Sequence, residues 1–316
     1  MDAFDIFEFL ARKAALGPTA IVTVTHVSGS SMRNPGAHLA VAADGDWCGS
    51  LSGGCIEAAV VAEALDALRR GETREVRFGA GSPYIDIRLP CGGSLDVLIN
   101  PIEDTTLARH AVTLFERRLP FVLALPLVSG SLTIERKEPT WRTGRDASTF
   151  RVSHLPPLSI AIIGHGGSVE ALDAQSRIAR AVTHVFTPDV DLAARLSSSG
   201  TPISVLRIPT EKVALKPDRW TAIAFLFHDH EWETALMVEA LASPAFYVGA
   251  MGGRAAQARR VEALEHAGVA VEAIGRLRAP IGLIPSSRDP QVLALSVLAE
   301  IVRDYDAAIQ RADVLI

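Results

Sequence analysis

The second half of the chain begins with the stretch Leu158-Ser-Ile-Ala-Ile-Ile-Gly164-His-Gly166-Gly167-Ser-Val169. An apolar, β-branched run enters a glycine turn, and the apolar spacing that follows predicts a helix over 169–181. The first βα turn of a dinucleotide-binding fold has this context, because the helix amides and dipole then point at a phosphate. Val169 stands where the glycine fingerprint has its third small residue, which alters the packing of that helix. A nucleotide at the turn and a doubly wound domain without one are both open interpretations.

Strands and helices alternate from this stretch onward. We expect further strands at 184–186, 203–208 and 221–227, and a final helix at 291–305 whose apolar residues repeat at helical spacing. Alternation of this kind is typical of a parallel sheet covered by helices. The sequence therefore predicts a Rossmann-like, doubly wound parallel-sheet domain over residues 157–316.

The first half carries shorter elements of both kinds. Between Pro139 and Pro157 the chain becomes polar and loses periodicity, which indicates a domain boundary. We expect a mixed α+β domain over residues 1–150, and hence an α/β chain of two domains. The expected helices of the first domain are 5–13 and 57–69, and its expected strands are 20–26, 38–42, 74–78, 85–89 and 95–99.

Composition excludes several classes of protein. The 316 residues are 48% hydrophobic, enough for two cores, and a net charge of -5 without a long basic run argues against a nucleic-acid partner. The acidic first ten residues do not resemble a signal peptide, and no apolar stretch approaches the roughly 20 residues of a membrane helix. Three cysteines, an odd number, indicate free thiols in a reducing compartment. We expect a cytoplasmic protein with no membrane or nucleic-acid partner.

Two glycine and cysteine clusters mark candidate binding loops in the first hundred residues. One runs from 29–37 to Gly49-Ser-Leu-Ser-Gly53-Gly54-Cys55-Ile-Glu57, and the other is Cys91-Gly92-Gly93. Glycine allows close backbone approach, and Cys55 stands where a loop becomes a helix, a place that favours a thiolate or an anion. A tight turn and a small buried thiol are the alternative. The neighbouring glycine pairs favour function for Cys55 and Cys91, and Cys48 lacks them.

Further candidate residues follow expected strands of the second domain. The strand ending at Phe227 runs into His228-Asp-His230-Glu231, where ligands of α/β sheets usually bind. A polar helix start with solvated histidines is the alternative. Gly252-Gly253-Arg254 follows another strand, and an arginine there suits a phosphate. Asp189 has nearly the spacing of a ribose-binding acid, but its place after Pro188 argues against that role. No nucleophile with base and orienting group is visible, which argues against a hydrolase.

These motifs together resemble the XdhC/CoxI family of molybdoenzyme maturation factors. The Gly-Gly-Cys-Ile-Glu and Cys-Gly-Gly pieces are specific to that family. The resemblance implies a family-specific N-terminal domain and a Rossmann domain. It also implies a chaperone that binds molybdenum cofactor in its molybdopterin form, protects it during sulfuration and delivers it to a xanthine dehydrogenase-like molybdoenzyme. We also expect a cysteine desulfurase as a partner, and a homo-oligomer such as a dimer. The matching segments, in order, are 29–37, 49–57, 91–93, 164–167, 228–231, 247–254, 279–283 and 294–301.

The chain departs from the family pattern mainly in its second domain. Thr187-Pro-Asp189 replaces Asp-Pro-Arg, Gly252-Gly253-Arg254 replaces Gly-Ser-Arg, and Glu233 replaces an aspartate. Because the usual acid is missing at Thr187, these changes bear on nucleotide binding and partner choice.

We expect the cofactor to lie between the two glycine-rich domains, with its phosphate on amides and on Arg33 or Arg254. Cys55 and Cys91 are the expected ligands of molybdenum or its sulfur, because soft thiolates suit that centre. Glu57 and His228 would tune protonation nearby. A nicotinamide-dependent oxidoreductase that uses the Rossmann turn, with His228 as an acid, is the alternative. The other cofactor-binding candidates are Gly53, Gly54, Gly92, Gly93, Gly164, Gly166, Gly167, His230 and Gly252.

Overall fold

The structure is a computed structural model, which describes residues 3–29, 33–84, 92–136, 143–211, 213, 215–227 and 230–312. The chain divides into two compact units, Met1–Pro156 and Pro157–Arg311, and each unit is described by itself. None of the helices among the described residues has the length and apolar character needed to cross a membrane.

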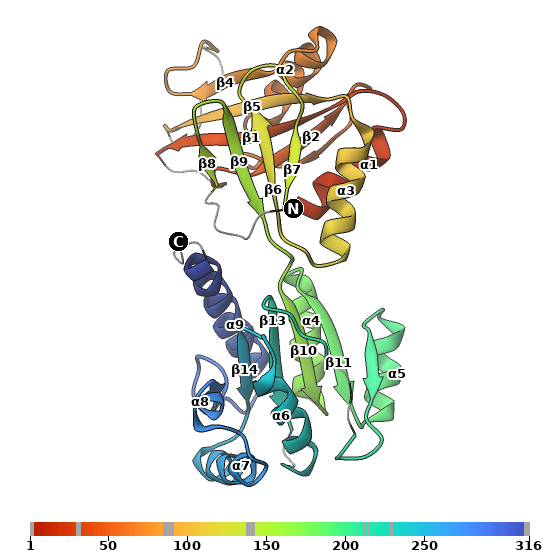
Figure 1. Ribbon diagram of the computed structural model, residues 1–316, viewed down its shortest axis with the longest axis vertical. Helices are drawn as coiled ribbons and strands as arrows, with labels where there is room; N and C mark the ends of the chain where they lie inside the picture. The colour runs from red at the N-terminus through yellow and green to blue at the C-terminus, as the bar shows by residue number, and fades with distance from the viewer. Residues whose placement is uncertain are drawn as a thin grey trace. The chain divides into compact units, whose positions relative to one another are not determined.

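A five-stranded antiparallel sheet forms the first half of unit 1 (Figure 1). Side chains along a strand point alternately to the two faces of the sheet, so the central strand at Thr19–Ser28 contributes to two cores. Ala20, Val22 and Val24 pack beneath helix α2 (Glu57–Arg70), whereas Ile21 faces the opposite core. In sheet order the strands are β3 (Trp47–Gly49), β2 (His38–Ala42), β1 (Thr19–Ser28), β5 (Ser94–Ile102) and β4 (Arg74–Gly79).

A second antiparallel sheet of four strands encloses the other core of unit 1. Helices α1 (Ala3–Lys13) and α3 (Thr105–Glu116) lie side by side and add their apolar faces to that core (Figure 1). In order, the strands are β7 (Thr133–Glu135), β6 (Phe121–Pro126), β9 (Thr149–His154) and β8 (Gly144–Arg145).

The expected irregular segment between Pro139 and Pro157 is wrong for residues 144–145 and 149–154, which are strands. Phe150, Val152 and His154 point into the core, and the side chains between them are half-buried. This alternation is short and mostly polar, so it does not stand out in the sequence. Pairing with the apolar strand β6 supplies the partner that makes it a strand.

Unit 2 is a six-stranded parallel sheet with helices on both faces, as the sequence predicts. Helices α4 (Gly167–Ile178), α5 (Val190–Ser198) and α9 (Pro290–Ala312) contribute to one core. Helices α6 (Thr234–Ala242), α7 (Arg254–His266) and α8 (Val271–Ile274) contribute to the other (Figure 1). The doubly wound fold is therefore confirmed. In order, the strands are β12 (Ile203–Val205), β11 (Val182–Thr187), β10 (Ser159–Gly164), β13 (Thr221–Leu226), β14 (Tyr247–Ala250) and β15 (Leu277–Arg278).

Two motifs of the family resemblance stabilise this unit. The buried Glu300 carboxylate on α9 accepts hydrogen bonds from the Tyr247 hydroxyl and the Gly282 amide, both at 2.7 Å. Ser296 Oγ accepts from the Ile284 amide at 2.6 Å. Segments 279–283 and 294–301 thus hold the last helix against β14, a structural role.

Candidate functional site

The glycine-rich segments of unit 1 meet at one end of the five-stranded sheet. The antiparallel register places Ser28 opposite Ser94, and Gly79 opposite Ser94 as well. On the other side of β1, Thr23 is opposite His38 and Leu39 is opposite Gly49. The loops that begin or end at these residues therefore share one end of the sheet, although they are distant in sequence (Figure 1).

Gly29 and Gly93 pack directly together at this end. A Cβ on Gly29 would lie 3.1 Å from the Gly93 Cα, and both Gly29 and Gly92 have left-handed backbone conformations. The Ala80 amide donates to the Gly93 carbonyl at 3.0 Å, which ties the loop after β4 to the same place. Cys91 lies outside the described residues, but the glycines that follow it are fixed beside the Gly29 loop.

Cys55 is exposed on the loop that leads from β3 into α2. The buried Glu57 carboxylate organises this loop, because it accepts hydrogen bonds from four backbone amides and two serine hydroxyls. Its donors are the amides of Leu51, Ser52, Gly54 and Ile56, at 2.8–3.2 Å, and the hydroxyls of Ser50 and Ser52, at 3.1 and 2.7 Å. The loop presents the Cys55 thiol to solvent from a backbone that is held at many points.

The same contacts set the charge of Glu57 and occupy the amides of the loop before the helix. Burial opposes the carboxylate charge, but hydrogen bonds from Ser52 and from the Leu51 amide outweigh it and lower the pKa of Glu57 to about 2. Ser52 Oγ also accepts from the Cys55 and Ile56 amides, at 3.0 and 3.2 Å. The amides of the loop that leads into α2, up to the N-cap Ile56, therefore already bind Glu57 and Ser52. Glu57 positions the loop, and its contact with a cofactor stays a prediction.

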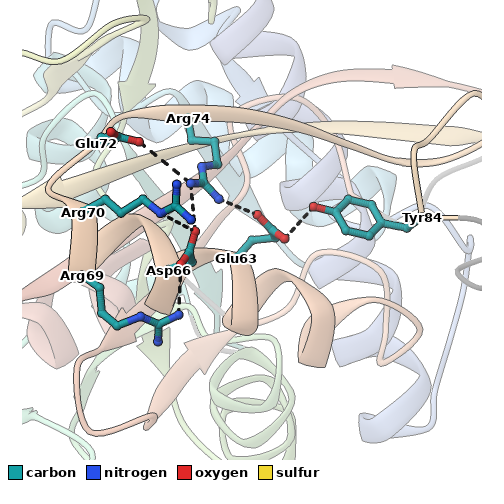
Figure 2. A network of polar contacts seen from close by, with 7 residues as sticks. All are labelled: Glu63, Asp66, Arg69, Arg70, Glu72, Arg74 and Tyr84. Atoms are coloured by element: carbon teal, nitrogen blue, oxygen red, sulfur yellow. Dashed lines mark hydrogen bonds and ion pairs between the residues drawn. The ribbon is translucent and has the colours of Figure 1, made fainter.

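A polar network fixes the chain before the Cys91 segment to the same helix (Figure 2). The Tyr84 hydroxyl donates to Glu63 on α2 at 2.5 Å, and its ring stacks on Phe78 with centroids 5.4 Å apart. Burial and this hydrogen bond raise the pKa of Tyr84 to about 12. Arg74 joins Glu63 to Asp66 at 2.9 and 3.0 Å. The chain on either side of residues 85–91 is thus held in place, by Tyr84 on α2 and by Gly93 beside Gly29.

In unit 2 the predicted glycine turn lies where the sheet reverses its strand order. β10 and β13 are parallel neighbours, with Gly164 paired to Leu226. A Cβ on Gly164 would lie 2.6 Å from the Leu226 carbonyl oxygen, so this glycine serves strand packing. Gly166 is the N-cap of α4 at φ +78° with no atom within 4 Å of an added Cβ, and Gly167 begins the helix. The open side of this turn faces the carboxyl edge, where ligands of such sheets bind.

Asp189 and Thr187 do not offer a ribose-binding acid. The Asp189 carboxylate caps α5 and accepts from the Leu192 amide at 2.9 Å. Thr187 is fully buried at the end of β11, and its hydroxyl accepts from the Asp189 amide at 3.1 Å. The argument against a ribose role for Asp189 is thus supported by its use as a helix cap.

The two other candidate loops of unit 2 are joined by an ion pair that the sequence does not reveal. His228 lies outside the described residues, and His230 begins a short 3-10 helix, η1 (His230–Trp232). Just after it, Glu233 binds Arg260 through contacts of 3.0 and 3.1 Å, with both side chains buried. Arg260 also donates to the Met251 carbonyl at 2.9 Å, which fixes the turn before Gly252.

Arg254 is exposed as the first residue of α7, at the positive end of the helix dipole. Gly252 has a left-handed conformation at φ +126°, and Gly253 is the N-cap. The described residues contain no group of three His, Cys, Asp or Glu side chains arranged to hold a metal ion. Among them, the predicted loops group by unit, around Cys55 in unit 1 and around Gly166 in unit 2.

These features define a class of two-unit protein, in which an antiparallel unit with a cysteine loop precedes a Rossmann unit. The model of the XdhC and CoxI family matches residues 13–79, and that of the XdhC Rossmann domain matches residues 160–301. The molybdenum cofactor insertion chaperone PaoD of Escherichia coli (strain K12) is 31% identical over 297 residues, 94% of this chain and 86% of PaoD. The chain belongs to the XdhC and CoxI family.

Two further proteins are similar along most of the chain. The protein YqeB of Escherichia coli (strain K12) is 26% identical over 90% of this chain, which spans 43% of YqeB. A crystal structure of a Bacillus halodurans protein named as a xanthine dehydrogenase has a TM-score of 0.77 at 19% identity, covering 97% of this chain and 96% of that one. At 19% identity, the similarity to the Bacillus halodurans structure shows a shared fold.

Proposed function

We propose that the protein is a molybdenum cofactor chaperone, which protects the molybdopterin cofactor during sulfuration and inserts it into a xanthine dehydrogenase-like molybdoenzyme. The observation that carries this proposal is the exposed Cys55 thiol on a loop that Glu57 holds rigid. Similarity to PaoD over nearly the whole chain supports the choice of cargo.

The chemistry of the cysteine loop suits this cargo. A thiolate is a soft ligand, which molybdenum and its sulfur accept more readily than a hard oxygen ligand. Cys48, by contrast, is half-buried and burial raises the pKa of its thiol, so it is a poor ligand. We assign Cys55 and Cys91 to one site. Anchoring of Tyr84 on α2 and of Gly93 beside Gly29 supports their proximity.

The amides of the loop before α2 already bind Glu57 and Ser52, so they are not donors for the phosphate of the cofactor. Arg33 is the candidate in unit 1, on the loop between β1 and β2. Arg254 and the Gly166 turn are the candidates in unit 2, and a nucleotide at that turn stays part of the proposal. An arginine at a helix start has its charge balanced when an anion binds there.

Delivery requires a recipient, and sulfuration requires a sulfur donor. We propose a xanthine dehydrogenase-like enzyme and a cysteine desulfurase as these partners. We also propose a cytoplasmic location, because three cysteines, an odd number, suit a reducing compartment.

We further propose a homodimer formed by α9. Val292, Leu295 and Val302 repeat along one exposed side of that helix, with Leu295 58% exposed. An antiparallel pair would bring the exposed Arg288 of one copy toward the exposed Asp306 of the other. Light scattering should then find a dimer for the natural chain and a monomer for Leu295→Glu, whereas one mass for both would contradict this interface.

The proposal is tested by purifying the full chain from a host that makes molybdenum cofactor, and measuring bound molybdenum, pterin and NAD. We expect molybdenum and pterin in a fixed ratio to protein. Bound NAD without pterin would instead support a nicotinamide-dependent oxidoreductase and overturn the chaperone function.

A further inference from the structure

A polar cavity of about 180 Å³ lies in unit 1, beside the loop that carries Arg33. Residues of α1, of that loop, of β2 and of β9 line it. Its volume is many times the roughly 10–15 Å³ that a single water molecule needs. The cavity therefore has room for a small polar ligand or for one group of a larger ligand.

Two buried histidines from different sheets meet at this cavity. His38 on β2 and His154 on β9 are 4% and 5% exposed, and their Nε2 atoms are 3.3 Å apart. His38 Nδ1 is 2.8 Å from the Thr23 hydroxyl. A hydrogen bond between two Nε2 atoms needs one N–H and one lone pair, so one proton lies between the rings and at least the accepting ring is neutral.

Burial keeps this pair neutral, and a positive charge next to His38 adds to the effect. Burial, then His154, then the Arg33 guanidinium lower the pKa of His38, and burial lowers the pKa of His154 to about 3. Among the described residues that line the cavity, Arg33, His38 and His154 are the titratable ones. The cavity thus combines one cationic side chain with two imidazoles and has no carboxylate among those residues.

The loop backbone is shaped to bring this charge close. Gly36 has φ +93°, and a Cβ there would lie 2.9 Å from Thr143 Cγ2. Glycine at position 36 therefore lets the loop that carries Arg33 pass close to the side of the cavity formed by β9. The Thr143 hydroxyl, which accepts from the Ser153 amide at 3.4 Å, adds a polar group to the lining.

We propose that this cavity binds a phosphate-class oxyanion, with Arg33 as the countercharge and the His38–His154 pair as hydrogen-bonding partner. The inference deepens the proposed function. It rests on that function only where it assigns the phosphate to the cofactor. An anion offsets the repulsion between Arg33 and a protonated His38, so binding takes up a proton from the buffer. Because uptake accompanies binding, affinity rises as the pH falls.

Calorimetry on the full chain without cofactor tests the site, with inorganic phosphate as the probe at pH 6 and pH 8. We expect saturable binding. Because phosphate itself changes its charge between these two pH values, sulfate, a dianion at both, is the probe for proton uptake. Sulfate should bind more tightly at pH 6, with binding heats that differ between buffers of different protonation enthalpy. Arg33→Gln should bind about tenfold more weakly, since it removes a charge-assisted hydrogen bond. Arg109→Gln is the control, because Arg109 is exposed on α3 and bonds its own helix. Equal affinity in these two variants, or no binding to the natural chain, would overturn the site.

The histidines are tested by His154→Phe, which keeps a ring between Phe7 and Phe121, whose centroids are 5.3 and 4.8 Å from that of His154. This variant should lose the proton uptake. Imidazole NMR signals of the natural chain give the same answer without a variant, since phosphate should shift those of His38 and His154. Unshifted signals under saturating phosphate would contradict the assignment.

Cofactor retention distinguishes the sources of the phosphate. Arg33→Gln should lower retention of cofactor as well as affinity for inorganic phosphate. Full retention in a variant that no longer binds phosphate would overturn the assignment of that phosphate to the cofactor. A natural chain that binds phosphate but never carries pterin would instead overturn the proposed function and leave the anion site standing.

Discussion

The two units each begin a helix with a glycine pair, yet the two helix starts are used differently. In the loop that leads into α2, the amides of Leu51, Ser52, Gly54 and Ile56 all donate to Glu57. At the start of α4, Gly166 is an N-cap without a side-chain hydrogen bond and has open space beside it. A glycine pair before a helix therefore does not by itself indicate an anion site, because the chain can supply its own carboxylate.

The two helix starts therefore have different roles in the proposed function. In unit 1 the internal carboxylate supports a loop with an exposed thiol, and we propose that ligand binding there depends on Cys55. In unit 2 the helix start has open space beside Gly166, where we propose that a ligand binds. The predictions below test whether each start has the task assigned to it.

Glu57→Gln should cause the largest loss of stability. The pKa of Glu57 is lowered to about 2 in the folded protein, so its stabilisation is complete above the ordinary value of 4.5. That stabilisation is lost as the pH falls toward 2, and the shift corresponds to ~3 kcal/mol. Denaturant unfolding at pH 7 and pH 3 should show a difference between variant and natural chain that shrinks at the lower pH. Glu116→Gln, at an exposed position of α3, should change stability little at either pH. A pH-independent difference for Glu57→Gln would contradict the assigned role of the carboxylate.

Cys55→Ser and Cys91→Ser should each lower cofactor retention about tenfold, or ~1.4 kcal/mol, while folding is nearly unchanged. A hydroxyl keeps the shape of the thiol but is a poor soft ligand. The measurement is the molybdenum content of protein purified from a host that makes the cofactor.

Cys48→Ser is the matched control and should retain cofactor, since Cys48 is half-buried against the Asp5 carbonyl. Equal molybdenum content in all three variants would remove the shared thiol site from the proposal.

Gly166→Val should weaken ligand binding at the second helix start without unfolding unit 2. Gly166 has φ +78° and ψ −170°, a conformation found almost only in glycine, which costs another residue roughly 1–3 kcal/mol, but the space around the Cβ is open. Gly200→Val is the control, because it also places a valine at a positive φ, +84°, with open space and far along the chain from the turn. Calorimetric affinity for cofactor should fall in the first variant only. The same affinity in both would make the turn a fold element.

The smallest effect concerns nicotinamide nucleotides. Thr187 is buried and Asp189 caps α5, so the described carboxyl edge lacks the acid that binds a ribose. NAD should bind at millimolar rather than micromolar levels, near −4 rather than about −8 kcal/mol. A micromolar dissociation constant, or oxidation of NADH with any small carbonyl compound, would support the oxidoreductase alternative.

Much of the fold could be predicted from sequence, because local patterns specify it. The run at 158–163 and the apolar spacing of 291–305 lie in a parallel sheet and its covering helix as predicted. β9 was not predicted, because its short alternation gains strand character only by pairing with β6. The expected strand at 85–89 lies outside the described residues.

The candidate site was less predictable, because its main contacts join distant residues. Cys55 and its glycines stand out locally, but the six hydrogen bonds of Glu57 depend on how the loop folds back. The His38–His154 contact joins two sheets across 116 positions, and no pattern of either strand signals it. Glu233 and Arg260 are likewise separated by 27 positions, and their shared burial is visible only in three dimensions.

The central claim is that the protein holds molybdenum through the Cys55 thiolate, and it is tested most directly by molybdenum X-ray absorption spectroscopy of the loaded full chain. We predict a protein sulfur ligand in addition to the dithiolene sulfurs in the natural chain, and its loss in Cys55→Ser. The Cys48→Ser spectrum should match that of the natural chain. Identical molybdenum–sulfur shells in the natural chain and Cys55→Ser would contradict the account.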